Sequence, residues 1–81
     1  MPGLTYGRLD EVLRSLGFSL RDPYEKNKVY LHEGTGALVM FPEFPDDAEV
    51  LARHLGMVRG VLDAYGIADP LDFAAKLQRA T

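Results

Sequence analysis

The feature that most constrains the fold is a pair of short, largely apolar runs, residues 28–32 and 37–41, separated by the sequence Glu-Gly-Thr-Gly at 33–36. The two glycines can adopt positive φ, which suits a four-residue hairpin loop. The pattern therefore predicts two antiparallel strands joined by this loop. Because both runs are apolar at successive positions, apolar side chains point to both faces of the hairpin. We expect one face to pack on helices, and the other to meet water, another layer or a partner subunit.

An amphipathic helix is predicted before the hairpin. Apolar residues recur at i, i+3, i+4 and i+7 after Thr5, a candidate N-cap, and Gly17 provides the stop. Alternating apolar and polar residues at 18–21 then predict a short first strand. The Asp-Pro pair at 22–23 predicts a turn after it.

A longer helix is predicted after the hairpin. Its apolar stripe runs from Leu51 to Tyr65 with spacings of four, three, four and three, and a glycine follows. The sequence places the start of this helix only between Asp46 and Ala52. Asp46 and Glu49 have the spacing of a capping box, which would begin the helix before its apolar stripe.

A last short helix is predicted after Asp69, a candidate N-cap, with Pro70 at its first position. The order is then α-β-β-β-α-α, an α+β fold in which a three-stranded antiparallel meander packs its helices on one face. We expect the 81 residues to form a single domain over 1–81. A core of this size leaves a small stability margin, so an oligomer is expected.

Composition narrows the functional classes. The chain has no cysteine, which excludes disulfides and thiolate nucleophiles, and no short ligand spacing predicts a metal or another cofactor. Nine Lys and Arg against twelve Asp and Glu give a net charge of −3, which argues against broad binding to phosphate backbones. No apolar run has the length of a membrane span or a signal peptide, so we expect a cytoplasmic protein without a membrane partner.

Several short motifs resemble, in order and spacing, the HicA family of small toxins. They are "LGF" at the end of the first helix, "VYLH" in the second strand, "LVMFPEF" in the third and "GI" before the last helix. The chain is most similar to an uncharacterised HicA-like branch with an "HLxxVR" pattern, present here as His54, Leu55, Val58 and Arg59. The resemblance implies a double-stranded-RNA-binding-domain-like fold, a ribosome-independent ribonuclease activity and a HicB-like antitoxin as partner.

The chain departs from the family at the catalytic segment. HicA toxins carry a "GSHH"-like segment that enters the second strand and supplies the catalytic histidine, whereas residues 25–28 here read Glu-Lys-Asn-Lys. Neither asparagine nor lysine replaces an imidazole that exchanges protons near pH 7. We therefore expect a branch without the usual catalytic histidine and without classical cleavage of messenger RNA. Whether the protein is an enzyme at all stays open.

The remaining histidines, His32 and His54, are weak catalytic candidates. If the fold brought them together, two imidazoles could share acid and base catalysis and cleave RNA without a metal. The alternative is that His32 is an ordinary strand-end residue and that His54 packs near the start of the long helix.

Cations and tyrosines near the hairpin entry form a candidate RNA-binding set, because tyrosines can stack on bases and cations can pair with phosphates. The set is Arg21, Tyr24, Lys26, Lys28, Tyr30 and Arg53. Acidic residues at 22, 25 and 33 interleave with it and weaken a positive field.

Three hypotheses follow from the sequence. The first is a HicA-like protein that binds RNA, belongs to a toxin–antitoxin type of system and does not cleave. The second is a metal-independent ribonuclease that uses His32 and His54. The third is a protein-interaction or oligomeric module without nucleic acid. Under each hypothesis we expect a homo-oligomer formed through the sheet.

Overall fold

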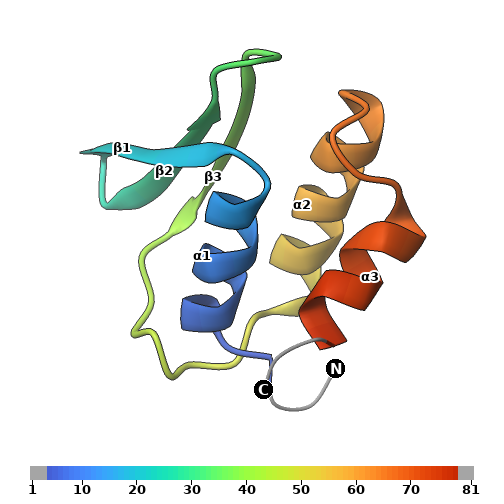
Figure 1. Ribbon diagram of the computed structural model, residues 1–81. Coiled ribbons are helices and arrows are strands. Elements are labelled where there is room, and N and C mark those ends of the chain that lie inside the picture. Colours follow the sequence, from blue (N-terminus) through green and yellow to red (C-terminus); the bar gives the residue numbers. More distant parts are fainter. Residues whose placement is uncertain (1–3, 79–81) are drawn as a thin grey trace.

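A computed structural model describes residues 4–78. Its elements are α1 (Tyr6–Ser15), β1 (Phe18–Tyr24), β2 (Asn27–His32), β3 (Ala37–Pro42), α2 (Ala52–Ala64) and α3 (Pro70–Gln78). The strands form one antiparallel sheet in the order β1-β2-β3, and the helices gather on one side of it (Figure 1). The predicted α+β class and element order are confirmed.

Helix α1 begins and ends where local chemistry predicts. The Thr5 hydroxyl accepts a hydrogen bond from the Arg8 backbone N–H at 3.2 Å, which satisfies one of the unpaired donors of the first turn. At the other end Gly17 has a φ of 100°, a conformation that only glycine adopts without strain. The apolar stripe of α1 is buried against the sheet and the other helices.

Strand β1 is longer than predicted, because it continues through Asp22 and Pro23 to Tyr24. The predicted turn at 22–23 is therefore wrong. Strand β1 lies at the edge of the sheet, where a proline is tolerated because an outward N–H needs no partner, and the register is irregular between Arg21 and Tyr24. The chain turns instead at Glu25 and Lys26, whose φ angles are 50° and 68°.

The hairpin of β2 and β3 is confirmed with its four-residue loop. The register pairs Tyr30 with Val39 and His32 with Ala37 without interruption. Gly36 has a φ of 80°, and its N–H donates to the His32 carbonyl oxygen at 2.7 Å. The side chains of Tyr30 and Val39 are fully buried and face the helices.

Helix α2 begins at Ala52, which resolves the start that the sequence left open. The candidate capping box does not form. Glu49 makes an isolated bridge with Thr5, and the Asp46 carbonyl oxygen accepts from the Gly7 N–H at 2.9 Å, so the segment before α2 is held against the start of α1. Predicted core positions in α2 are confirmed at Val58 and Leu62, which are fully buried.

Helix α3 closes the layer of helices. Asp69 acts as predicted, since its Oδ1 accepts from the Asp72 N–H at 2.8 Å, and Pro70 is the first helical residue. Phe73 and Leu77 are buried in the common core. Over residues 4–78, no helix has the length and apolar character needed to cross a bilayer.

Candidate functional site

His54 is a buried residue that forms a hydrogen bond with Tyr6. Its Nδ1 lies 2.7 Å from the Tyr6 hydroxyl, and that hydroxyl accepts from the Leu51 N–H at 3.2 Å. The Tyr6 hydroxyl has one proton to donate and a second lone pair to accept with, so it can pair with Nδ1 in either tautomer of the neutral imidazole. Only 7% of His54 is exposed, and the rings of Phe41 and Phe44 lie within 6 Å of its ring. Burial lowers the pKa of His54, and the nearby charge of Arg53 adds to this.

His32 closes the β2–β3 loop. Its Nδ1 accepts from the Thr35 backbone N–H at 3.2 Å and lies 3.0 Å from the Thr35 hydroxyl. The ring packs beside Phe18, at 5.1 Å between ring centres, and against Gly17. The imidazole thus holds the β2–β3 loop by its hydrogen bonds and packs on the residues that follow α1.

The two histidines lie toward opposite ends of the sheet. His32 is paired with Ala37, whereas His54 packs on Phe41, four positions further along β3. Four residues of a strand span about 13 Å. The structure does not bring the two imidazoles to one phosphate.

The turn at Glu25 and Lys26 presents two of the RNA-binding candidates. Tyr24 is 59% exposed and Lys26 is exposed beside it. Two successive non-glycine residues with positive φ cost roughly 1–2 kcal/mol each, and the Asn27 side chain supports them by donating to the carbonyl oxygens of Tyr24 and Glu25. Residues 25 and 26 of the 25–28 segment therefore form a strained, solvent-exposed turn, and residues 27 and 28 begin β2.

Among the other candidates, two cations are paired with carboxylates, Tyr30 is buried and Arg53 is exposed. Arg21 pairs with Glu33 at 3.3 Å, and Lys28 lies 3.8 Å from Asp46. Tyr30 has no ring face open to a base because it is fully buried, which removes it from the RNA-binding set. Arg53 is exposed in the first turn of α2. For the exposed candidates, RNA binding stays a prediction.

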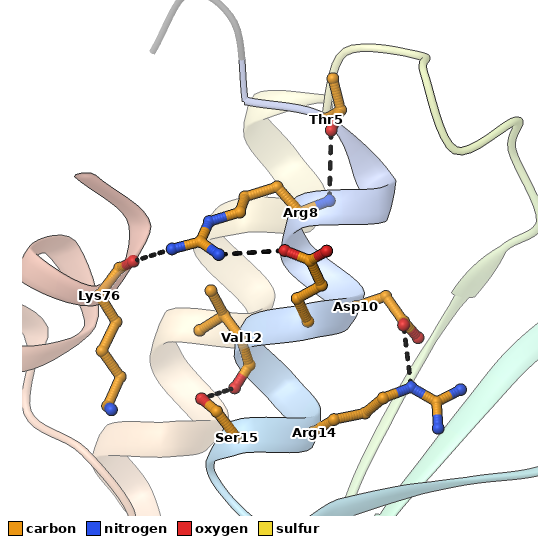
Figure 2. Close-up of polar contacts among 8 residues, drawn as sticks. Thr5, Arg8, Asp10, Val12, Arg14, Ser15 and Lys76 are labelled. Atoms are coloured by element: carbon orange, nitrogen blue, oxygen red, sulfur yellow. Dashed lines mark hydrogen bonds and ion pairs between the residues drawn. The ribbon is translucent and has the colours of Figure 1, made fainter. Parts of the chain in front are cut away.

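The partner of Tyr30 was not anticipated from the sequence. Its hydroxyl donates to Asp10 Oδ1 at 2.6 Å. Arg14 Nε donates to the other oxygen of the same carboxylate, Asp10 Oδ2, at 2.9 Å (Figure 2). Burial, followed by the bond to Asp10, raises the pKa of Tyr30, and the same carboxylate raises the pKa of Arg14. The i,i+4 spacing of Asp10 and Arg14 was a visible signal for an ion pair, but nothing local connects it to Tyr30.

Arg8 joins α1 to α3. Its guanidinium donates to Glu11 at 3.0 Å and to the backbone carbonyl oxygen of Lys76 at 2.9 Å (Figure 2). That carbonyl belongs to the last turn of α3, where acceptors lack partners within the helix. Arg8 therefore caps the end of α3 from another helix.

A shallow, open hollow borders these residues and is acidic. It has a volume of about 590 Å³ and is lined by Thr5, Gly7, Arg8, Asp10, Glu11, Asp46 and Asp47. Its four carboxylates outnumber its one cation and disfavour a phosphate backbone there. Across residues 4–78, no group of three or more His, Asp or Glu side chains is arranged to hold a metal ion.

The face of the sheet turned away from the helices is apolar on β2 and β3, whereas β1 places Ser19 and Arg21 on it, opposite Leu31 and Val29. It carries Val29 and Leu31 from β2, paired directly with Met40 and Leu38 from β3. These side chains alternate with the buried Tyr30 and Val39 and so point the opposite way. We call these residues (Val29, Leu31, Leu38 and Met40) the open face.

Exposure on the open face is uneven. Leu38 is 51% exposed and Met40 is 40% exposed, whereas Val29 in the central strand is only 9% exposed. The apolar surface that meets solvent therefore lies mostly along β3.

What the fold shares with the HicA-like expectation is the order α-β-β-β-α-α around a three-stranded antiparallel sheet. Comparisons of the chain with protein-family models, with curated proteins and with solved structures find no match.

Proposed function

We propose that this protein is a non-catalytic interaction module that self-associates through its sheet. The observation that carries the proposal is the one-sided packing of that sheet. The helices cover one face, and among residues 4–78 no element covers the open face (Figure 1). A sheet with apolar side chains on both faces is stabilised when the second face is also removed from water.

The expected association is weak. Burial of about 400 Å² of apolar surface contributes about 10 kcal/mol at about 25 cal/mol per Å². The loss of translational and rotational freedom costs an amount of the same order, roughly 4–15 kcal/mol. We therefore expect an assembly whose population depends on protein concentration.

The absence of catalysis is supported by the histidines. His54 is buried and engaged with Tyr6, His32 is engaged with Thr35, and the 25–28 segment contains no imidazole. Purified protein should leave RNA intact. Asn27→His should not create cleavage, because an imidazole at the start of β2, next to the strained turn, lacks a pocket that orients it and the phosphate together.

The test is the solution mass across a range of concentrations. Sedimentation velocity from low to high micromolar protein should show a mass that rises from monomer toward dimer. The double variant Leu31→Lys with Leu38→Lys should stay monomeric, whereas Leu71→Lys should behave like the wild type, because Leu71 is 82% exposed on α3, away from the sheet. A wild-type monomer at every concentration would contradict the proposal.

A second candidate function is RNA binding by a HicA-like protein that does not cleave, with a HicB-like antitoxin as its partner. The observation that favours it is the exposure of Tyr24 beside Lys26 on the turn that matches the family's catalytic segment. Fluorescence anisotropy with a labelled single-stranded RNA at low salt is the test. Binding should weaken in Tyr24→Ala and in Lys26→Ala, and the lack of any wild-type binding would count against this candidate.

A further inference from the structure

The two edges of the sheet differ in how they are protected. Strand β1 has an irregular register between Arg21 and Tyr24, with a charge at Asp22 and a proline at 23. These are the features that block pairing with another strand. Strand β3 pairs regularly with β2 from residue 37 to 42 and carries no charge. Its edge is open to another strand.

The hydrogen bonds of β3 fix which groups point outward. The Glu43 N–H donates to the Lys26 carbonyl oxygen at 3.2 Å, and the register from there is continuous. In an antiparallel ladder, hydrogen-bonded pairs alternate, so residues 41, 39 and 37 bond to β2. The N–H and C=O groups of Leu38 and Met40 therefore point away from β2. Within residues 4–78, no backbone hydrogen bond joins these groups to another segment.

We infer that the partner in self-association is a second copy that pairs antiparallel with β3, through its own β3, across a two-fold axis. The inference rests on the proposed function and specifies its geometry. With Leu38 of one copy opposite Met40 of the other, both residues donate and accept across the seam, and the two copies form one sheet of six strands. An antiparallel edge is complementary to itself under a two-fold rotation, so one strand serves both partners.

Side-chain exposure agrees with edge pairing better than with stacking of open faces. On the open face, Leu38 and Met40 are the most exposed side chains, and edge pairing places them against each other. The central Val29 is already largely covered and has little left to bury. Since β3 carries no charge, two copies of a chain with net charge −3 can meet there without like charges at the seam.

Two variants separate edge pairing from face stacking in a sedimentation equilibrium experiment. Met40→Pro removes an outward N–H and leaves the bonds to β2 in place, whereas Leu31→Lys adds a charge to the open face on the central strand. The substitution is present in both copies, so the dimer loses the hydrogen bond from residue 40 twice. Met40→Pro should therefore weaken dimerisation about tenfold or more. Leu31→Lys should weaken it by less than about threefold, because residue 31 lies outside the seam. Far-UV circular dichroism checks that both variants fold.

Amide exchange in the wild type provides a second measurement that needs no variant. The Leu38 and Met40 amides should exchange more slowly as protein concentration rises. The matched control is the Leu20 amide, which the same alternation points outward from β1, and its exchange should not change with concentration.

The possible results are distinct. If Leu31→Lys abolishes the dimer and Met40→Pro does not, the copies stack by their open faces; the edge pairing is then wrong and self-association stands. Slower exchange at Leu20 in place of Leu38 and Met40 would move the contact to β1 and also overturn the edge pairing. A wild type that is monomeric at all concentrations would remove both proposals.

Discussion

The two faces of the sheet are built from similar residues and have different surroundings. On β3, Val39 and Phe41 are buried under the helices, while the alternating Leu38 and Met40 are largely exposed. The difference does not come from the strand sequence, which is apolar throughout. It comes from the helices, which pack on one face only. Apolar residues on both faces of a strand therefore predict that both faces of the sheet are covered, and one copy of the chain covers only one of them.

The helix-facing side differs from the open face in a second way, because it contains polar groups with assigned partners. Tyr30 reaches Asp10, and His54 reaches Tyr6. A buried polar group without a partner would be costly, so these pairs help to specify how the helices sit on the sheet. The four side chains of the open face are all apolar, and the polar pair beside them, Arg21 with Glu33, is exposed to solvent.

The largest expected effect is on the covered side. Leu62→Ala should lower the free energy of unfolding by about 2–5 kcal/mol, because Leu62 is fully buried and its truncation leaves a cavity. Lys26→Ala should be neutral within about 0.5 kcal/mol, since the side chain is exposed and either residue adopts the positive φ at similar cost. Urea denaturation of both variants measures this. Equal losses of stability in the two variants would mean that Leu62 is not part of the hydrophobic core.

A smaller loss is expected from the polar pair beneath the sheet. Tyr30→Phe keeps the ring and removes the hydroxyl that donates to Asp10, so it should cost about 1–3 kcal/mol. Arg14 also donates to Asp10, and an additional Arg14→Met change should show coupling with Tyr30→Phe in a double-mutant cycle. Strict additivity in urea melts would indicate that the three groups do not form one network.

The pH dependence of stability tests the second polar pair. The unfolded chain protonates His54 near pH 6.5, whereas burial lowers the pKa of His54 in the folded protein. The unfolded state therefore binds more protons, and stability should fall as the pH drops below about 7. Above about pH 7, His54 is neutral in both the folded and the unfolded state, so it should cause no further change in stability. Denaturation at several pH values, with NMR titration of the ring, provides the measurement.

His32→Gln is the matched control for that experiment and should keep the dependence on pH. His54→Leu should remove it, although the loss of the hydrogen bond between His54 and Tyr6 lowers stability at every pH. If the pH dependence of stability disappeared in His32→Gln and survived in His54→Leu, its source would be His32 and the assignment to His54 would be wrong.

The smallest effect is expected on the open face. Leu38→Ser in dilute protein should change the free energy of unfolding by less than about 1 kcal/mol, because half of the side chain is already in water. The same change should reduce self-association at high concentration. A large loss of stability in the dilute monomer would show that the open face is covered within one chain.

Much of the fold was predictable from local sequence, and the reason is that those signals act over a few residues. The Thr5 cap, the Gly17 stop, the loop at 33–36 and the Asp69 cap each depend on hydrogen bonds or dihedral angles within about one turn. The apolar periodicity of α1 and α2 likewise identified buried positions before any contact was known.

The tertiary structure decided the features that depend on distant residues. Helix α2 starts at Ala52 because the preceding segment pairs with the start of α1, and β1 continues through Pro23 because its outer edge is free. The roles of the candidate residues were settled in the same way: Tyr6 and His54 are 48 residues apart in the chain, and Tyr30 and Asp10 are 20 apart. A sequence records which groups can form hydrogen bonds and which side chains avoid water. Which of them meet is determined only when the helices have packed on one face of the sheet and left the other open.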